Sequence, residues 1–382
     1  RAAESAPGFL WVTNAAGTSV PVLGFGLTID TSGNVYQAGQ IYKDATFGET
    51  TFTNPGMFVS KYDPAGQLDW VIEDGSPSAE GWSIGLDASN NVYVLCGIGL
   101  QAVFGGQTIT NPSSALALVK YDSNGTLIWA KNLCWGSLIY PSGMAVDARG
   151  NCYFDATSWG NGAHTDLTNF TGGALVGKCD SDGNLAWIKS FGSSSNSNPN
   201  ISDLALDGTN GIYVFGHFRP SLVIDSATLS GGAGYNIFLA KFTGDGQLQW
   251  VKQSTGTNNT GSGRLAVDPV GNAFITGVFT TSASFDNLVL SNAVAGNYYY
   301  LTKYDSAGNA LWAQSLGMGG SRSAVTVDSS GNCYAAAELS GNTNIFSKFD
   351  AGGDLLWTKI VPNGMFMLFQ LVAHSVGNCF FS

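Results

Sequence analysis

Two short sequence phrases alternate along this chain and return at nearly constant intervals. One reads KYDSAGNALWAQ at residues 303–314 and has five variants elsewhere. The other reads LAVDPVGNAFITG at residues 265–277, and its copies carry an Asp every 57 to 61 residues. These aspartates are Asp30, Asp87, Asp147, Asp207, Asp268 and Asp328. A period of this length indicates a fold built from repeated supersecondary units.

Each repeat contains four stretches with the pattern of β-strands. The first is a short apolar run that ends at the Asp. A turn with Gly and Asn follows it, since both residues tolerate positive φ. The second is aromatic and β-branched, as in NVYVLCG. A variable loop leads to the third and fourth strands, which flank an Asp-x-x-Gly turn. The fourth carries Leu and Trp two residues apart, and this spacing puts both on one face.

Four antiparallel strands repeated in this way predict an all-β chain folded as a β-propeller of four-stranded antiparallel blades. Six full copies and a degenerate seventh, LVAHSVGNCFFS at 371–382, predict seven blades in a single domain over residues 1–382. The expected blades lie near residues 18–75, 76–133, 134–192, 193–254, 255–316 and 317–361, and residues 362–382 form inner strands of the seventh.

The first residues match a fourth strand that has no partner within its own repeat. The stretch PGFLWVTNAAG at 7–17 places Trp11 in the repeated Trp position. We therefore expect residues 1–17 to supply a closing outer strand, so that both termini complete the last blade.

The paired phrases Asp-x-x-Gly-Asn-x-Tyr and Lys-[Tyr/Phe]-Asp-x-x-Gly-x-Leu-x-Trp resemble the bacterial beta-propeller repeat family called SBBP, and more distantly NHL-type propellers. The resemblance covers nearly the whole chain. It implies a secreted or cell-surface bacterial protein, often embedded in a larger multidomain chain or assembly. It supplies no catalytic residues that could be matched to this sequence.

Composition narrows the classes of partner. A net charge of −11 with only 16 Lys and Arg argues against binding to a nucleic-acid backbone. No apolar run reaches the roughly 18 residues of a membrane-spanning helix, so we expect no transmembrane segment. Neither HExxH nor CxxC occurs, and the Asp turns lack the spaced carboxylates of a calcium loop. We expect no cofactor and no metal.

The six cysteines follow the repeat and do not form an evident disulfide framework. Cys152, Cys333 and Cys379 each follow an Asn, in the position that Val35 holds in the first copy. Cysteines in such positions are expected to be small buried apolar residues.

Candidate site residues are those outside the repeated positions, because a residue in a repeated position serves the blade. Seven of the ten Trp occupy the repeat. The others, Trp82, Trp135 and Trp159, map to the variable-loop end of neighbouring blades, with Tyr140 nearby. Loops on a rigid scaffold often carry binding residues, and aromatic side chains are common at binding hot spots. The alternative is that these Trp fill gaps between blades.

Charged residues divide in the same way. Ten of the sixteen Lys and Arg occupy repeated positions, where we expect them to be solvated or weakly paired with Asp. Arg264 and Arg322 lie near the start of the innermost strands of blades five and six, and Arg219 follows blade four's second strand beside His217. Asp203 holds the position of Arg264 one blade earlier. One interpretation is an Asp203–Arg264 pair that neutralises the channel mouth. The other is an Arg cluster that binds a carboxylate or an anionic sugar.

These features favour a non-catalytic extracellular or cell-surface protein, which binds a glycan or a protein through its variable-loop face. Two alternatives stay open. One is a propeller lyase or hydrolase that acts at the polar channel mouth with His217, Arg219 and Asp203. The other is a structural surface module that assembles with its own copies.

Overall fold

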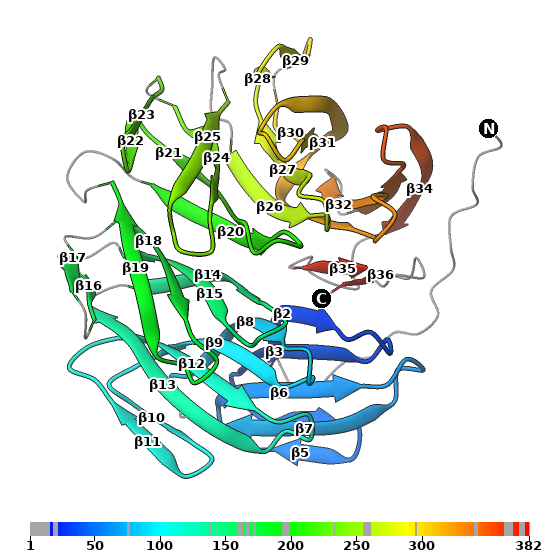
Figure 1. The fold of residues 1–382 in the computed structure, drawn as a ribbon. Coiled ribbons are helices and arrows are strands. Elements are labelled where there is room, and N and C mark those ends of the chain that lie inside the picture. The colour runs from blue at the N-terminus through cyan, green and yellow to red at the C-terminus, as the bar shows by residue number, and fades with distance from the viewer. Residues whose placement is uncertain are drawn as a thin grey trace. The chain divides into compact units, whose positions relative to one another are not determined.

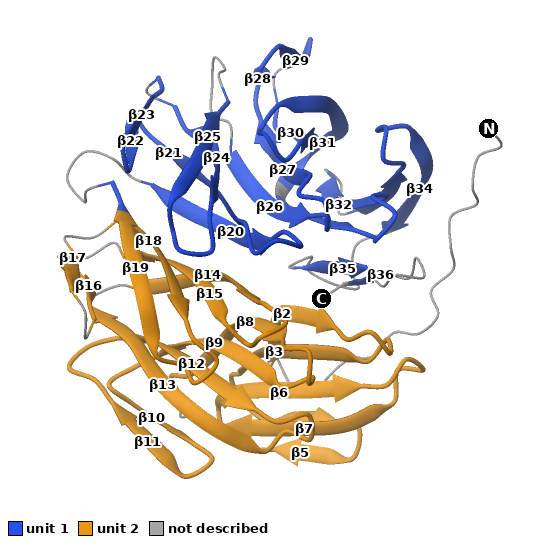
Figure 2. Cartoon of the chain, in the orientation of Figure 1, with its two compact units in different colours: residues 1–7, 191–382 blue, residues 8–190 orange. Residues whose placement is uncertain are grey.

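The chain folds as antiparallel sheets in two compact units. The computed structural model describes residues 16–17, 22–74, 77–136, 139–158, 163–165, 168–170, 173–192, 199–232, 234–254, 261–294, 296–339, 343–362, 370–373 and 379–381. This part of the chain contains no helix, and therefore no helix able to cross a membrane. Unit 2 comprises residues 8–190, and unit 1 comprises residues 1–7 and 191–382 (Figure 2).

Unit 2 holds three four-stranded sheets in which the strand order follows the chain (Figure 1). The first is β2 (Val22–Ile29), β3 (Val35–Ile41), β6 (Gly56–Tyr62) and β7 (Leu68–Asp74). The second is β8 (Glu80–Leu86), β9 (Val92–Ile98), β12 (Ala115–Tyr121) and β13 (Leu127–Gly136). The third is β14 (Ile139–Val146), β15 (Cys152–Ser158), β18 (Gly173–Cys179) and β19 (Leu185–Phe191). The first strand of the second sheet, β8, packs against the first strands of the other two sheets, β2 and β14.

Unit 1 repeats this plan. Its fourth sheet is β20 (Asn200–Leu206), β21 (Ile212–Phe218), β24 (Asn236–Phe242) and β25 (Leu248–Gln253). The fifth is β26 (Gly261–Val267), β27 (Ala273–Phe279), β30 (Tyr298–Tyr304) and the start of β31 (Ala310–Val327). The end of β31 opens the sixth sheet, which continues with β32 (Cys333–Leu339), β33 (Thr343–Phe349) and β34 (Leu355–Pro362). A hairpin of β35 (Leu371–Ala373) and β36 (Cys379–Phe381) follows. The predicted four-strand repeat and the all-β fold class are confirmed.

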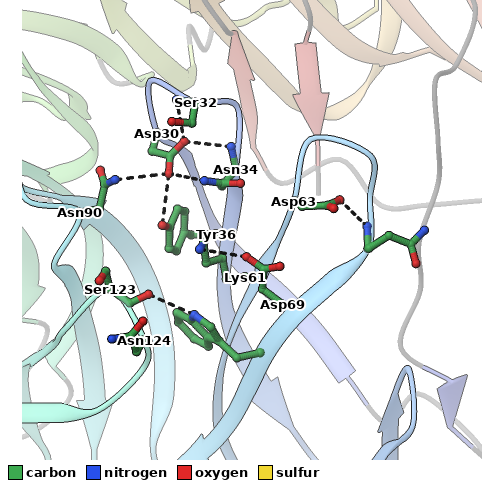
Figure 3. Close-up of polar contacts among 12 residues, drawn as sticks. Asp30, Ser32, Asn34, Tyr36, Lys61, Asp63, Asp69, Asn90, Ser123 and Asn124 are labelled. Carbon is green, nitrogen blue, oxygen red and sulfur yellow. Dashed lines mark hydrogen bonds and ion pairs between the residues drawn. The ribbon is translucent and has the colours of Figure 1, made fainter.

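The repeated Asp holds the turn between the first two strands. Oδ1 of Asp30 accepts the backbone N–H groups of Ser32 and Asn34, both at 2.9 Å. Its Oδ2 accepts the Asn34 side-chain amide at 2.7 Å and the Tyr36 hydroxyl at 3.3 Å (Figure 3). Asn90, from the next sheet, reaches the same oxygen. The predicted structural role of this Asp is confirmed.

Within each unit, the repeated Trp links a sheet to the one that follows it. Nε1 of Trp70 donates to the carbonyl of Ser123, in the turn between β12 and β13. Its ring covers Gly125, which has a φ of 83° and where a methyl group would lie 3.2 Å from Cε3. The same contact joins Trp129 to Gly183, Trp250 to Gly308 and Trp312 to Gly353. The repeated segment that ends in Gly-x-x-x-Trp contains both residues, so it specifies the contact between neighbouring sheets.

The repeated Lys before the third-strand turn is expected to be solvated or weakly paired with an Asp. Lys241 is 9% exposed and Lys303 is 5% exposed, so neither is solvated, whereas Lys241 is paired with an Asp. The Nζ atom of Lys241 lies 4.8 Å from the centre of the Tyr213 ring and 3.0 Å from Oδ2 of Asp207. A long aliphatic stem on an aromatic face and a paired ammonium explain the burial.

The loops between the second and third strands are more regular than predicted. Each of the first five sheets has a short β-hairpin there. The hairpins are β4 (Ala45–Phe47) with β5 (Thr50–Phe52), β10 (Gln101–Phe104) with β11 (Gln107–Thr110), β16 (Ala163–His164) with β17 (Asn169–Phe170), β22 (Ser221–Ile224) with β23 (Ala227–Ser230), and β28 (Ser282–Phe285) with β29 (Leu288–Ser291). Four of these turns begin at Gly48, Gly105, Asp225 or Asp286, with φ near 50°. The apolar side chains before them, Phe47, Phe104, Ile224 and Phe285, are buried. The prediction of variable loops is therefore wrong for these segments.

Candidate functional site

A β-bulge interrupts the first strand of all six sheets near its start. The register shifts fall around Phe25, Trp82, residues 142–143, Ser202, residues 263–264 and residues 320–322. Bulged residues leave the ladder, and bulges often re-aim side chains beside functional sites. Three predicted site residues, Trp82, Arg264 and Arg322, occupy these bulges.

In unit 2 the bulges form an aromatic stack. The rings of Phe25 and Trp82 lie 4.7 Å apart at an interplanar angle of 11°. Nε1 of Trp82 donates to Oε2 of Glu80 at 3.0 Å. Both rings are half-buried, and they come from the adjacent strands β2 and β8. The two stacked rings therefore fill the gap between the first and second sheets, which was the alternative interpretation of Trp82. Because both rings are only half-buried, part of their surface is still accessible to solvent.

Two exposed tyrosines lie near the ends of strands in the first and third sheets of unit 2. Tyr140, in β14, is 48% exposed, and Tyr42, directly after β3, is 45% exposed. Burial, followed by the charge of Glu80, raises the pKa of Tyr42. A methyl group at Gly97 would lie within 4 Å of both Trp82 and Pro141, so the residue next to Tyr140 approaches the stack. We call Phe25, Tyr42, Glu80, Trp82 and Tyr140 the aromatic patch.

Trp135 does not belong to the aromatic patch. It lies at the end of β13, three strands from β8 in the second sheet, which is about 14 Å at the usual strand spacing. Its ring stacks on His164 at 6.3 Å, and the Nδ1 atom of His164 bonds Asn169 at 2.8 Å. The structure thus separates Trp135 from Trp82. Trp159 lies outside the described residues.

In unit 1 the predicted polar residues come together on the fourth and fifth sheets. Nδ1 of His217, in β21, lies 2.8 Å from the hydroxyl of Ser262 in β26. Ser262 is also hydrogen-bonded to the hydroxyl of Ser202 in β20. Nη1 of Arg264 donates to the Ser202 carbonyl at 3.4 Å. These bonds join the two bulges into one network.

Asp203 ties the same two strands through the backbone. Its Oδ1 accepts the N–H of Leu204 and its Oδ2 accepts the N–H of Leu265, both at 3.0 Å. Burial raises the pKa of this carboxyl, although the Arg264 charge opposes the shift. Asp203 therefore links β20 to β26 through backbone hydrogen bonds. Arg264 acts on this carboxyl through its charge, which is the part of the Asp203–Arg264 interpretation that the structure contains.

Arg219 and His217 share one aromatic neighbour, Tyr235. The guanidinium of Arg219 lies 4.4 Å from the centre of the Tyr235 ring, and the His217 imidazole meets that ring edge-on at 4.9 Å. Arg219 is exposed. Burial and the Arg219 charge lower the pKa of His217 from 6.5 to about 4, so the imidazole is neutral at pH 7. We call His217, Arg219, Tyr235 and Ser262 the Arg219 cluster.

Arg322 lies one sheet further along, in the bulge of β31. Its backbone N–H donates to the Tyr299 hydroxyl at 3.1 Å. The neighbouring Ser323 donates to Oγ1 of Thr276, which also accepts the backbone N–H of Arg264. The hydroxyls of Thr276 and Ser323 therefore connect the bulge that carries Arg264 to the bulge that carries Arg322.

Sequence reasoning missed several participants. The sequence offered no reason to select Phe25, Tyr42 or Glu80. Because Ser and Tyr are frequent in this chain, the sequence also did not distinguish Ser202, Ser262 and Tyr235 from other residues of these types. The signal that could have found the serines is their place near the start of the first strand in two consecutive repeats, five residues before Asp207 and six before Asp268. The described residues contain no group of three His, Cys, Asp or Glu side chains able to hold a metal.

Comparisons with known proteins identify the type of fold. No protein-family model and no curated protein sequence matches the chain. The chain is similar to the WD40 repeats of RRP9, with 10% identity, a TM-score of 0.52, and coverage of 95% of this chain and 86% of the other. The Neurospora crassa Pan2 WD40 domain gives 8% identity, a TM-score of 0.53, and coverage of 94% and 85%. A PL25 ulvan lyase, solved bound to -[GlcA(1-4)Rha3S]-, gives 12% identity, a TM-score of 0.50, and coverage of 87% and 82%. These likenesses define a propeller-like fold and nothing finer.

Proposed function

We propose that this protein is a non-catalytic carbohydrate-binding propeller of the bacterial SBBP type, secreted or displayed at the cell surface. The observation that carries the proposal is the aromatic patch of unit 2. Trp82 and Phe25 are stacked and half-buried, and Tyr140, whose neighbour Pro141 approaches Trp82, is 48% exposed. Rigid aromatic rings offer a large contact area at low entropic cost, and the C–H faces of a pyranose ring pack well on them.

Glu80 supplies the polar partner that a sugar requires. Its Oε2 accepts the Trp82 indole N–H, which fixes the carboxylate at the edge of the stacked rings. A carboxylate has about four acceptor positions, so one such bond leaves others for sugar hydroxyls. A few placed polar groups beside apolar surface are typical of small-ligand sites.

A glycan array, followed by titration of the best hit, tests this proposal. We expect Trp82→Ala and Tyr140→Ala to weaken binding at least tenfold while both variants remain folded at the assay temperature, as circular dichroism can verify. Trp135→Ala is the matched control, because it removes the same side chain from another strand and should leave binding intact. An array without hits, or hits that are indifferent to Trp82 and sensitive to Trp135, would contradict the proposal.

We also propose that the sheets form a seven-bladed propeller closed by both termini. The supporting observation is β1 (Ala16–Gly17), which pairs with the hairpin strand β4. The end of β13, Trp135–Gly136, pairs with the hairpin strand β16 in the same way. Residues 16 and 17 thus pair with the first sheet's hairpin as the end of a last strand pairs with the hairpin of the sheet after it, and in this proposal β35 with β36 would supply the inner strands of the same blade.

Truncation of Trp11 tests this closure. If Trp11 covers the first sheet's turn as Trp129 covers Gly183, we expect Trp11→Ala to lower the free energy of unfolding by about 3 kcal/mol, and Trp129→Ala, as a positive control, to do the same. A loss below about 0.5 kcal/mol, typical of an exposed side chain, would exclude the closure.

One observation favours acid–base chemistry as a second candidate function. His217 is neutral at pH 7, has its Nδ1 held by Ser262, and lies beside an exposed Arg219. A neutral imidazole with one fixed nitrogen can serve as a general base. Incubation with acidic polysaccharides should then produce the ultraviolet absorbance of unsaturated uronates, and His217→Ala should abolish it. Binding without any such product would restrict the protein to recognition.

A further inference from the structure

We propose that the Arg219 cluster of unit 1 is a subsite for the carboxylate of a hexuronate, with Arg219 gripping the carboxylate and His217 with Ser262 bonding the adjacent sugar hydroxyls. This inference rests on the proposed carbohydrate-binding function and names the substrate class. It concerns a group of residues separate from the aromatic patch, on the fourth and fifth sheets.

Arg219 is prepared for a planar anion. The Cζ atom of its guanidinium lies 4.4 Å from the centre of the Tyr235 ring, so the ring packs against the charged group. The side chain is exposed, and no carboxylate of the described residues forms an ion pair with it. Stacked guanidinium groups recognise carboxylates through two parallel N–H···O bonds, a geometry that Lys cannot reproduce.

The backbone on both sides of this pair is fixed. Arg219 leads into β22, and Tyr235 directly precedes β24, so the two residues flank the β22–β23 hairpin. The N–H of Gly231 donates to the Pro220 carbonyl at 2.7 Å and closes the hairpin base. Asn236 donates to the Gly234 carbonyl at 3.0 Å. A site held this way loses little conformational entropy when it binds a ligand.

His217 and Ser262 provide polar groups of the kind a sugar hydroxyl needs. The imidazole meets Tyr235 edge-on, and its Nδ1 is engaged by the Ser262 hydroxyl, which bonds Ser202 in turn. Because burial and Arg219 keep the pKa of His217 low, the imidazole is neutral, and since Ser262 engages Nδ1, Nε2 is the nitrogen left to bond a sugar hydroxyl. The Ser262 hydroxyl has one further acceptor position after its bonds to His217 and Ser202, so the two side chains together can contact neighbouring hydroxyls.

The local charge balance favours an anion despite the overall charge of −11. Arg264 places a second guanidinium in the same network through its bond to the Ser202 carbonyl. The acid of this network, Asp203, already accepts two backbone N–H groups and has a raised pKa because it is buried. The carboxyl is therefore committed to the backbone, while the network and its edge carry the guanidinium groups of Arg264 and Arg219.

Calorimetric titration with two matched probes tests the inference on the unaltered protein. Oligogalacturonides carry free carboxylates, and the same oligomers in methyl-esterified form carry none. We expect the free acids to bind at least tenfold more tightly, as the loss of a charge-assisted bidentate pair predicts. A sulfated neutral oligosaccharide is the third probe, and binding as tight as that of the free acids would overturn the assignment to carboxylate.

Variants locate the effect. Arg219→Gln should remove the preference for free acids, Arg219→Lys should retain only part of it, and Arg149→Gln, an exposed Arg in a turn of unit 2, should change nothing. If free and esterified oligomers bind equally and only Trp82→Ala weakens them, the carbohydrate-binding proposal stands and this inference falls. If no oligomer binds at all, both fall. Because the comparison of probes needs no variant, a misfolded Arg219→Gln protein would not block the test.

Discussion

Trp129 in β13 stands over Gly183 in the turn that joins β18 to β19, and a methyl group on Gly183 would lie 2.8 Å from Cη2 of the indole. Gly183 also has a φ of 78°, which costs a residue with a Cβ about 1–2 kcal/mol. We expect Gly183→Ala to lower the free energy of unfolding by about 3 kcal/mol, because the indole must also move. Urea denaturation followed by tryptophan fluorescence measures the change.

Gly106→Ala in the same unit is the control for that substitution. Gly106 has a φ of 86°, yet a methyl group there would meet nothing within 4 Å. Its expected loss is the conformational cost alone, about 1 kcal/mol. Equal losses in the two variants would show that the indole contact does not limit this position.

Lys241 and Asp207 form a buried ion pair with an Nζ–Oδ2 distance of 3.0 Å. Lys241→Met keeps the stem on the Tyr213 ring and leaves the carboxylate without its cation, so we expect a loss of about 2 kcal/mol. Lys252→Met is the matched control, since the Lys252–Asp286 pair is at 3.5 Å and about a third exposed; it should cost at most about 0.5 kcal/mol. Thermal and urea unfolding compare the two, and a cost for Lys241→Met no larger than for Lys252→Met would refute the buried role.

The lowered pKa of His217 predicts a pH-dependent stability. Between about pH 6.5 and pH 4 the unfolded chain protonates this imidazole while the folded protein keeps it neutral. The unfolded state then binds more protons, so acidification through this range destabilises the folded protein, by at most about 3 kcal/mol. His217→Gln should remove that part of the loss.

The difference between wild type and His217→Gln isolates the imidazole, because Asp203, whose raised pKa acts in the opposite direction, is present in both. Urea unfolding at a series of pH values supplies the two curves. Parallel curves from pH 7 to pH 4 would show that His217 titrates alike in the folded and unfolded states.

All six cysteines are free thiols, and burial raises the pKa of each. Thiolates are the reactive form, so we expect iodoacetamide to leave the native protein almost unlabelled and to modify six thiols in denaturant. Mass spectrometry counts the adducts. Four adducts in denaturant would instead reveal one disulfide, for which Cys152 and Cys179 are the first pair to examine because they lie opposite each other on β15 and β18.

The repeat made the strands and their order predictable, because period-2 patterning and tight-turn residues are local properties. The burial of Lys241 and Lys303 was not predictable, since it depends on an aromatic ring in the neighbouring strand and, for Lys303, on the carbonyl of Ala351 in the next sheet. The short hairpins were missed because their signal, an apolar residue before Gly or Asp, is weak in any single copy.

The positions of the candidate residues were predictable in part. Discarding residues in repeated positions singled out Trp82, His217, Arg219 and Arg264, and the structure places Trp82 in the aromatic patch and the other three in or beside the polar network of unit 1. Trp135 was expected in a loop but lies in β13, because a position late in the fourth strand looks like a loop in sequence. The bulges were invisible, because one extra residue in a strand leaves no pattern until the partner strand fixes the register.

The contact between Trp and Gly has a direction, and this has consequences for the history of the chain. Within each unit, a sheet gives its indole to the sheet that follows and receives none from it in return. The second and the fifth copies, which each have a neighbour on both sides within their unit, thus have the same outgoing and incoming surfaces. An in-frame duplication or deletion of one whole copy leaves each remaining indole with a glycine turn to cover. Recombination between copies can therefore lengthen or shorten such a gene without the need to invent a new joint.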